Sequence, residues 1–281
     1  MAAEAVEAPS GKDAAYENFP VGSWLLPAAL RPHIATFYAF ARAIDDIADS
    51  PDLSPEEKVR RLDGFAQALA GDGAPEPGFE KGAALRRSLA ETGVTPQHGL
   101  DLIAAFKQDA VKGRYADWDD LMGYCILSAA PVGRYLLDLH GGSDHGYGPS
   151  DALCNALQVI NHLQDCQDDY RTLDRVYLPG DWMAEAGVTV ADLDRPACTP
   201  GLRRVIDRAL AGTRALLETA RPLPAGLRSR RLAMESGAIL DIAHTLTDRL
   251  ARQDPLAGRV ALGKGGFLGC CLRGALRGLF M

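Results

Sequence analysis

Hydrophobic residues recur at three- and four-residue spacing along most of the chain, which is the period of an amphipathic helix. In residues 33–49 the positions that follow this spacing are Ile34, Phe37, Tyr38, Ala41 and Ile44. No segment combines four or more residues of strict alternation with β-branched content, as a half-buried strand would. The pattern therefore predicts an all-α fold.

The starts of several helices are marked in the sequence. Pro27 and Pro32 indicate a break before the first main helix, and Ser54 before Pro55 is typical of an N-cap followed by a first helical residue. The remaining helical ranges are 82–91, 96–112, 118–139, 149–172, 201–220 and 227–253, with loops at 71–78 and 141–148 and a polar connection at 179–194. Because the loops are short, we expect one domain of roughly eight to ten helices.

Composition agrees with a helical globular protein. Apolar residues make up 47% of the 281 positions and charged residues 24%, whereas the strand-favouring aromatics supply only 7%. The net charge of −7 argues against a general nucleic-acid binder, because proteins that bind the phosphate backbone of a nucleic acid carry a basic surface.

The six cysteines form no CxxC motif, and the N-terminus lacks the basic and apolar regions of a signal peptide. No run of 18 uncharged apolar residues is present either. We therefore expect a cytoplasmic protein. Along the chain we expect a flexible N-terminal leader at 1–15, an all-helical domain at 16–264 and a basic C-terminal tail at 265–281.

The C-terminal region has the opposite charge to the rest. Residues 255–281 contain Arg259, Lys264, Arg273 and Arg277 and no acid, so residues 1–254 carry a net charge of −11. A basic end that contains Leu and Phe is suited to peripheral contact with the anionic inner face of the cytoplasmic membrane. The alternative is a poorly ordered basic tail.

Two aspartate pairs stand out within the predicted helices. Asp45 and Asp49 are four residues apart, as are Asp165 and Asp169, so each pair lies on one helical face, where like charges repel. Neighbouring positions are apolar, and burying charge without a partner is costly. Solvent-exposed acidic faces are one interpretation. The other is a Mg²⁺ site, because Mg²⁺ binds one or two carboxylates together with substrate phosphates.

Other site types are excluded by their missing motifs. The histidines form no HExxH, Glu-x-x-His or Cys-linked zinc set, and Asp241 with His244 is the nearest approach. The sequence contains no P-loop, GxGxxG or GxSxG. A diphosphate held by Mg²⁺ is therefore the leading chemical hypothesis, with Arg42 placed one turn before Asp45 to bind phosphate oxygens.

With these motifs, the sequence resembles the squalene/phytoene synthase family from about residue 17 to residue 264. The matching pieces are Phe37-Tyr38, Arg42, Asp45 and Asp49; Tyr124-Cys125 and Pro131-Val132-Gly133; and Gln158, Asn161, Asp165 and Asp169, followed by Arg175-Val176-Tyr177-Leu178-Pro179. The resemblance implies an isoprenoid synthase-type helical bundle around a central apolar cavity.

The resemblance is strongest to the bacterial hopanoid branch, through Glu17-Asn18-Phe19-Pro20-Val21 and the stretches 128–134 and 162–166. That branch converts presqualene diphosphate to hydroxysqualene with Mg²⁺ and without NADPH. Departures from the wider family support a specialised enzyme. Tyr16-Glu17-Asn18 replaces a Ser-x-Ser stretch, and Gln164 replaces an Arg. Arg175 lies one residue further along the chain than the corresponding arginine of the family. Hand-over to other hopanoid-pathway enzymes is a further expectation.

The resemblance also implies roles for individual residues. Asp45, Asp49, Asp165 and Asp169 are the expected Mg²⁺ ligands, with Asp46 auxiliary, and Tyr124 is placed in the catalytic set. Expected substrate-binding residues are Phe19, Phe37, Tyr38, Arg42, Gln158, Asn161, Arg175, Tyr177 and Lys264. Phe19, Phe37, Phe40, Tyr124 and Tyr177 are candidate cavity liners, for which plain core packing is the alternative.

Three functions remain open from the sequence: hydroxysqualene formation, another head-to-head prenyl synthase that uses farnesyl or geranylgeranyl diphosphate, and a non-catalytic, membrane-associated lipid-binding scaffold.

Overall fold

Helices form nearly all of the chain that the computed structural model describes, which comprises residues 6–7, 26–71 and 73–280, with side chains to residue 276. The prediction of an all-α fold is confirmed, since the described residues contain no strand. In chain order the elements are α1 (Arg31–Asp49), α2 (Pro55–Ala70), α3 (Glu80–Thr92), α4 (Gln97–Asp109), α5 (Trp118–Ser128), α6 (Ala130–Leu139), α7 (Gly148–Gln164), α8 (Cys166–Leu173), α9 (Gly180–Glu185), the 3₁₀ helix η2 (Val190–Asp194), α10 (Pro200–Ala220), α11 (Leu223–Gly226), α12 (Arg230–Leu250) and α13 (Lys264–Phe280).

The predicted helix start at Ser54 is confirmed. The Ser54 side chain accepts a hydrogen bond from the backbone N–H of Glu57, and Pro55 occupies the first turn. Thr199 and Ser229 cap α10 and α12 in the same way. Each cap satisfies a backbone donor that has no partner inside its helix.

Two ranges predicted as single helices are each divided in two. Residues 118–139 form α5 and α6, because Pro131 has no N–H to continue the hydrogen-bond ladder. Residues 149–172 form α7 and α8, which meet at Asp165. The second break has no Pro or Gly; instead Gln164 donates to the Val260 carbonyl and Gln167 to that of Leu193, tying the two sides of the break to different segments.

Two other segments contain more helix than the sequence pattern indicated. The polar connection at 179–194 contains α9 and η2, and the basic tail is a helix, α13, rather than an unordered segment. The division into leader, domain and tail stays a prediction, and apart from residues 6 and 7 the leader lies outside the described part of the chain.

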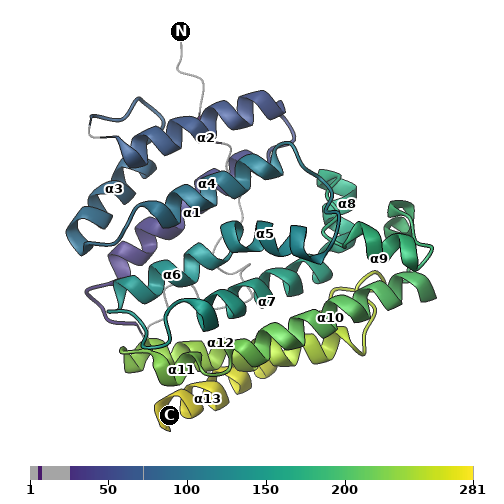
Figure 1. Cartoon of the computed structure of the whole chain (residues 1–281). Helices are drawn as coiled ribbons and strands as arrows, with labels where there is room; N and C mark the ends of the chain where they lie inside the picture. Colours follow the sequence, from purple (N-terminus) through teal and green to yellow (C-terminus); the bar gives the residue numbers. More distant parts are fainter. Residues whose placement is uncertain (1–5, 8–25, 72, 281) are drawn as a thin grey trace.

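The helices lie side by side in a layered bundle (Figure 1). Helices α1 to α4 pack together on one side, α5, α6 and α7 run through the middle, and α10, α12 and α13 cover the other side, with α13 along α12. Helices α8 and α9 lie together at one end of the bundle.

Close approach of helices in the middle depends on Gly133. A Cβ atom at this position would lie 2.4 Å from the Ser150 Oγ and 2.6 Å from the Cys154 Sγ, both on α7. Only a glycine lets α6 and α7 come this near, which gives a packing reason for the Pro-Val-Gly sequence at 131–133.

Candidate active site

An apolar cavity of about 340 Å³ runs between the helices of the bundle. Most of its wall consists of aliphatic and aromatic side chains from α1, α4, α6, α7 and α12. Its polar lining from α1 and α7 includes Tyr38, Arg42, Asp45, Gln158 and Asn161. With Phe37, the structure therefore brings six predicted substrate- or metal-binding residues, from motifs more than 100 positions apart, to one cavity.

Arg42 holds two of the aspartates of the first motif. Its guanidinium donates to Asp45 Oδ2 at 2.7 Å and to Asp46 Oδ1 at 2.5 Å, one helical turn along α1. The three side chains are partly buried. A charged group that enters the cavity beside Asp45 therefore meets an arginine and carboxylates in fixed positions.

The carboxyl of Asp45 is difficult to ionise. Burial and, after it, the nearby Asp49 carboxylate raise its pKa to about 7, against the opposing effect of the Arg42 charge. The proximity of these carboxylates is costly within the protein alone. A cation bound here would relieve this repulsion.

Asp49 is joined to the second half of the chain by a buried arginine. Arg175 donates to Asp49 Oδ1 at 2.6 Å and to the Ala48 carbonyl at 2.9 Å. Only 6% of Arg175 is exposed. The sequence predicted both residues for the same site, and the structure places them in direct contact.

The segment that carries Arg175 is fixed by backbone pairing with the loop before α5. Val176 N–H donates to the Gly113 carbonyl and Gly180 N–H to the Tyr115 carbonyl, both at 2.9 Å. A Cβ atom at Gly113 would lie 2.8 Å from the Asp174 carbonyl oxygen, so this approach requires glycine. Together with the hydrogen bond from the Arg175 backbone N–H to the Asp169 carbonyl in α8, this pairing fixes the backbone that carries the guanidinium.

Asp109 at the end of α4 is a site residue that the sequence did not reveal. It is buried and accepts hydrogen bonds from the Tyr124 hydroxyl at 2.7 Å and from the Tyr177 hydroxyl at 3.5 Å. Burial raises its pKa to about 6, an effect that the charge of Arg175 partly offsets. No second acid at helical spacing marks Asp109 in the sequence, so only the fold identifies it.

Aromatic rings surround this buried carboxylate. Tyr177 stacks on His162 with ring centroids 3.5 Å apart, and Tyr115 lies 5.6 Å from Tyr177 and 5.4 Å from Tyr124. Burial, followed by the charge of Arg175, lowers the pKa of His162 to about 3, so this imidazole is neutral. Tyr124 and Tyr177 thus belong to a packed polar cluster and do not line the cavity.

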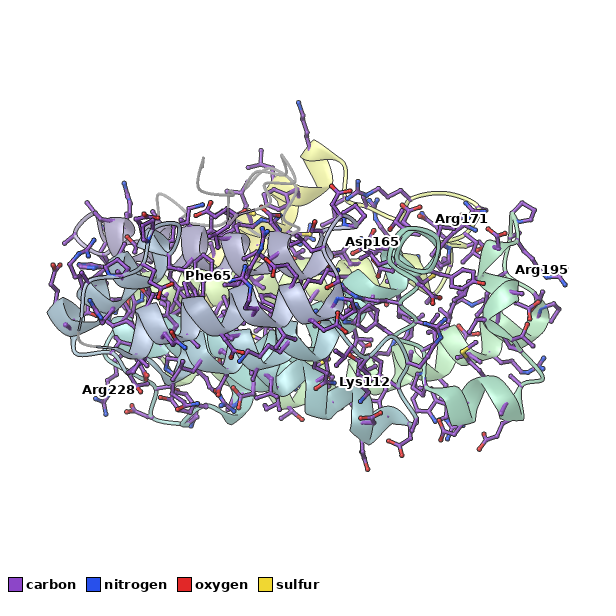
Figure 2. The ribbon with its side chains drawn as sticks, turned by 90° about the horizontal axis from the view of Figure 1, so that it is seen from above. Phe65, Lys112, Asp165, Arg171, Arg195 and Arg228 are labelled. Carbon is purple, nitrogen blue, oxygen red and sulfur yellow. The ribbon has the colours of Figure 1, made fainter. Side chains whose placement is uncertain are left out.

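The second aspartate motif lies where α7 ends and α8 begins. Asp165 occupies the junction and Asp169 the next turn, and both are partly buried. Figure 2 shows Asp165 on the same half of the molecule as Arg171 and Arg195, with Arg228 at the opposite end. Gln164 is buried and bound to the Val260 carbonyl, so it faces the segment that leads into α13.

The aspartate motifs do not form a closed metal cage by themselves. Across the described ranges, no group of three or more His, Cys, Asp or Glu side chains is close enough to hold a metal ion. Their donor atoms are nevertheless carboxylate oxygens. A divalent cation such as Mg²⁺ would offset the repulsion between the Asp45 and Asp49 carboxylates. Such a site suits a cation that takes part of its coordination from substrate phosphates and water.

Several predicted residues lie elsewhere. Phe19 is outside the described residues, and Lys264 is exposed at the start of α13, away from the cavity lining. Phe37 lines the cavity and stacks on Tyr135 at 4.0 Å, whereas Phe40 packs against Phe65 in the core. The roles expected for Phe19 and Lys264 stay predictions.

Among the described residues, every helix is too short or too polar to cross a membrane.

The chain is similar to known enzymes over most of its length. It is 45% identical to the hydroxysqualene synthase of Rhodopseudomonas palustris over 92% of this chain and 87% of the relative. It is 42% identical to the hydroxysqualene synthase of Zymomonas mobilis, over 96% and 91% respectively. The solved structure of squalene synthase HpnC from Alicyclobacillus acidocaldarius superposes with a TM-score of 0.73 at 33% identity, covering 85% of this chain and 89% of that one.

The last comparison identifies the bundle as the isoprenoid synthase-type fold that the motifs implied. The family model described as squalene/phytoene synthase matches residues 13–265, which include both aspartate motifs and Arg175. Since this match spans nearly the whole chain, the protein is an enzyme of the squalene/phytoene synthase family.

Proposed function

We propose that this enzyme converts presqualene diphosphate to hydroxysqualene, by ionisation of the diphosphate, rearrangement of the carbocation and capture of water. The observation that carries the proposal is the cavity, apolar over most of its wall and meeting Arg42 and Asp45 at its polar lining. A long isoprenoid with a diphosphate at its reacting centre needs both surfaces. The identity of 45% to a named hydroxysqualene synthase supports this choice within the family.

We propose Asp45, Asp49, Asp165 and Asp169 as the residues that hold Mg²⁺. When bound, the metal neutralises the charge that develops on the departing diphosphate. Arg42 lines the cavity and is the side chain we assign to the phosphate oxygens. Arg175 binds Asp49, and its charge also acts on Asp109, so the role we assign to it is to position the Asp49 carboxylate.

The cavity wall controls the carbocation. Phe37 and Tyr135 both line the cavity, and we assign their aromatic rings to the stabilisation of a cationic intermediate. The aliphatic wall excludes bulk water until the carbon skeleton has rearranged. Asn161 and Gln158 are the polar side chains beside Arg42 that we assign to placing the water or the diphosphate.

The test uses the purified full chain with presqualene diphosphate and Mg²⁺, without NADPH, and extraction of the products for mass spectrometry. Hydroxysqualene is the expected product, and chelation of divalent cations is expected to abolish its formation. Consumption of farnesyl diphosphate as sole substrate would instead identify a head-to-head synthase of another type and overturn the proposal.

A pair of variants separates catalysis from structure. Asp45→Asn removes a carboxylate from the cavity and is expected to lower turnover by about 10²-fold or more. Asp52→Asn changes an exposed aspartate in the loop after α1 and is expected to retain full turnover. Equal turnover by the two variants would contradict a role of Asp45 in the reaction, and absence of turnover by the unaltered chain would favour the non-catalytic scaffold.

A further inference from the structure

The C-terminal helix α13 presents a row of exposed leucines. Leu268, Leu272 and Leu276, together called the leucine face here, are 61%, 58% and 55% exposed. They are four residues apart, so they lie on one side of the helix. In the described part of the chain the other exposed large apolar side chains are Val111 and Tyr147, on separate elements. The leucine face is therefore a local concentration of apolar surface.

The leucine face cannot turn inward, because the opposite side of α13 is locked onto α12. A Cβ atom at Gly274 would lie 2.2 Å from the Gly237 carbonyl oxygen, so the two helices touch at their backbones. Cys270 on the same side is 1% exposed. Arg273 donates to Asp241 Oδ2 on α12 at 2.8 Å, which fixes the rotation of the helix.

The charges around the leucine face favour an anionic partner. Residues 255–281 contain four basic side chains and no acid, whereas residues 1–254 carry a net charge of −11. The charge of Arg273 is balanced by Asp241, whereas Arg259 and Lys264, before and in the first turn of α13, are exposed. An amphipathic helix with leucines outward and only basic charges has the properties of a helix that lies in the interface of an anionic bilayer.

We propose that α13 is a docking helix for anionic membrane surfaces, which inserts Leu268, Leu272 and Leu276 into the headgroup region. The helix lies flat, since none of the described helices is long and apolar enough to span. The family match ends at residue 265, so α13 lies outside the region shared with the family model except for its first two residues.

Membrane binding by α13 would place the cavity near the bilayer. Helix α12 lines the cavity through Leu232, Ser236 and Ile239 and carries α13 on its outer side. Docking therefore holds the cavity one helix away from the bilayer, where an apolar product partitions. This use rests on the proposed function, whereas the binding itself does not.

The experiment is co-sedimentation of the full chain with vesicles of phosphatidylcholine, with and without phosphatidylglycerol, at low and high salt. We expect binding only with phosphatidylglycerol, weakened by salt. The triple variant Leu268→Ser, Leu272→Ser, Leu276→Ser is expected to bind at least about tenfold more weakly, because less apolar area is buried. The matched control, Val111→Ser, removes an exposed apolar side chain on another surface and is expected to bind like the unaltered protein.

The outcomes are distinguishable. Absence of vesicle binding, or equal binding of the triple variant, overturns the proposal. So does light scattering that finds a dimer which the triple variant dissociates, because the leucine face would then be covered by a second copy. Turnover of presqualene diphosphate in detergent is expected to be unchanged in the triple variant. Vesicle binding without any turnover of presqualene diphosphate would contradict the proposed function but would support membrane binding by α13.

Discussion

Arg175 and Asp49 form an ion pair at 2.6 Å although 126 residues separate them in the chain. The pair joins the C-terminus of α1 to the segment after α8. Asp109, from a third part of the chain, shares the same arginine charge. These contacts hold one of the predicted metal ligands in place before any ligand binds.

We expect Arg175→Gln to reduce the free energy of unfolding by about 3–5 kcal/mol, because it leaves buried carboxylates without a compensating charge. Urea unfolding measures the change. The matched control is Arg114→Gln, whose ion pair with Asp174 lies at the surface and is worth less than about 1 kcal/mol. Adding Asp109→Asn to Arg175→Gln is expected to restore part of the loss. Equal midpoints for Arg175→Gln and the unaltered protein would contradict a stabilising role.

Tyr124→Phe is expected to cost about 1–3 kcal/mol of stability, because the buried Asp109 carboxylate loses its 2.7 Å hydrogen-bond donor. Tyr147→Phe removes a hydroxyl that donates to Asp138 at an exposed position, and is expected to change stability by no more than about 0.5 kcal/mol. Chemical denaturation of both variants provides the comparison. If the two substitutions lower the free energy of unfolding equally, the buried hydrogen bond to Asp109 stabilises the protein no more than the exposed one to Asp138.

Gly133→Ala is expected to destabilise the protein by about 1–3 kcal/mol, because the added methyl group overlaps Ser150 and Cys154 on α7. Gly123→Ala is the matched control within α5. A Cβ atom there meets nothing within 4 Å, so alanine is expected to stabilise the helix by up to about 1 kcal/mol. Thermal unfolding of the two variants is expected to shift in opposite directions, and a shift in the same direction would argue against close α6–α7 packing.

Glu235 is buried in the cavity wall, and burial raises the pKa of its carboxyl to about 8. The folded state therefore retains a proton that the unfolded chain releases near pH 4.5. The stability associated with this carboxyl is fully present below pH 4.5 and falls as pH rises to about 8, by up to about 1.4 kcal/mol per pH unit.

Glu235→Gln removes this titration. We expect the variant to unfold at a higher temperature than the unaltered protein at pH 8, and at a similar temperature at pH 4.5. Calorimetry across this range measures the difference. Parallel pH profiles for the two proteins would show that Glu235 ionises normally in the fold.

The amino-acid sequence by itself determined the helical fold, because apolar spacing and N-caps such as Ser54 are local properties of the chain. It also identified Arg42, Asp45, Gln158 and Asn161 as members of one cavity, because their spacing matches a family motif. The helix breaks at Ala129 and Asp165 were missed: Pro131 marked the first within an otherwise helical range, and nothing local marked the second.

The tertiary structure decided what lies against these motifs. Asp109 became a site residue only because folding buries it between Tyr124, Tyr177 and Arg175. For the same reason, Tyr124 packs against Asp109 and is not part of the cavity lining. The basic tail forms a helix that packs on α12 with its leucines exposed, because Gly274 lets α13 approach α12 closely. Burial and long-range charge depend on which segments meet, and this is a property of the folded chain rather than of residue spacing.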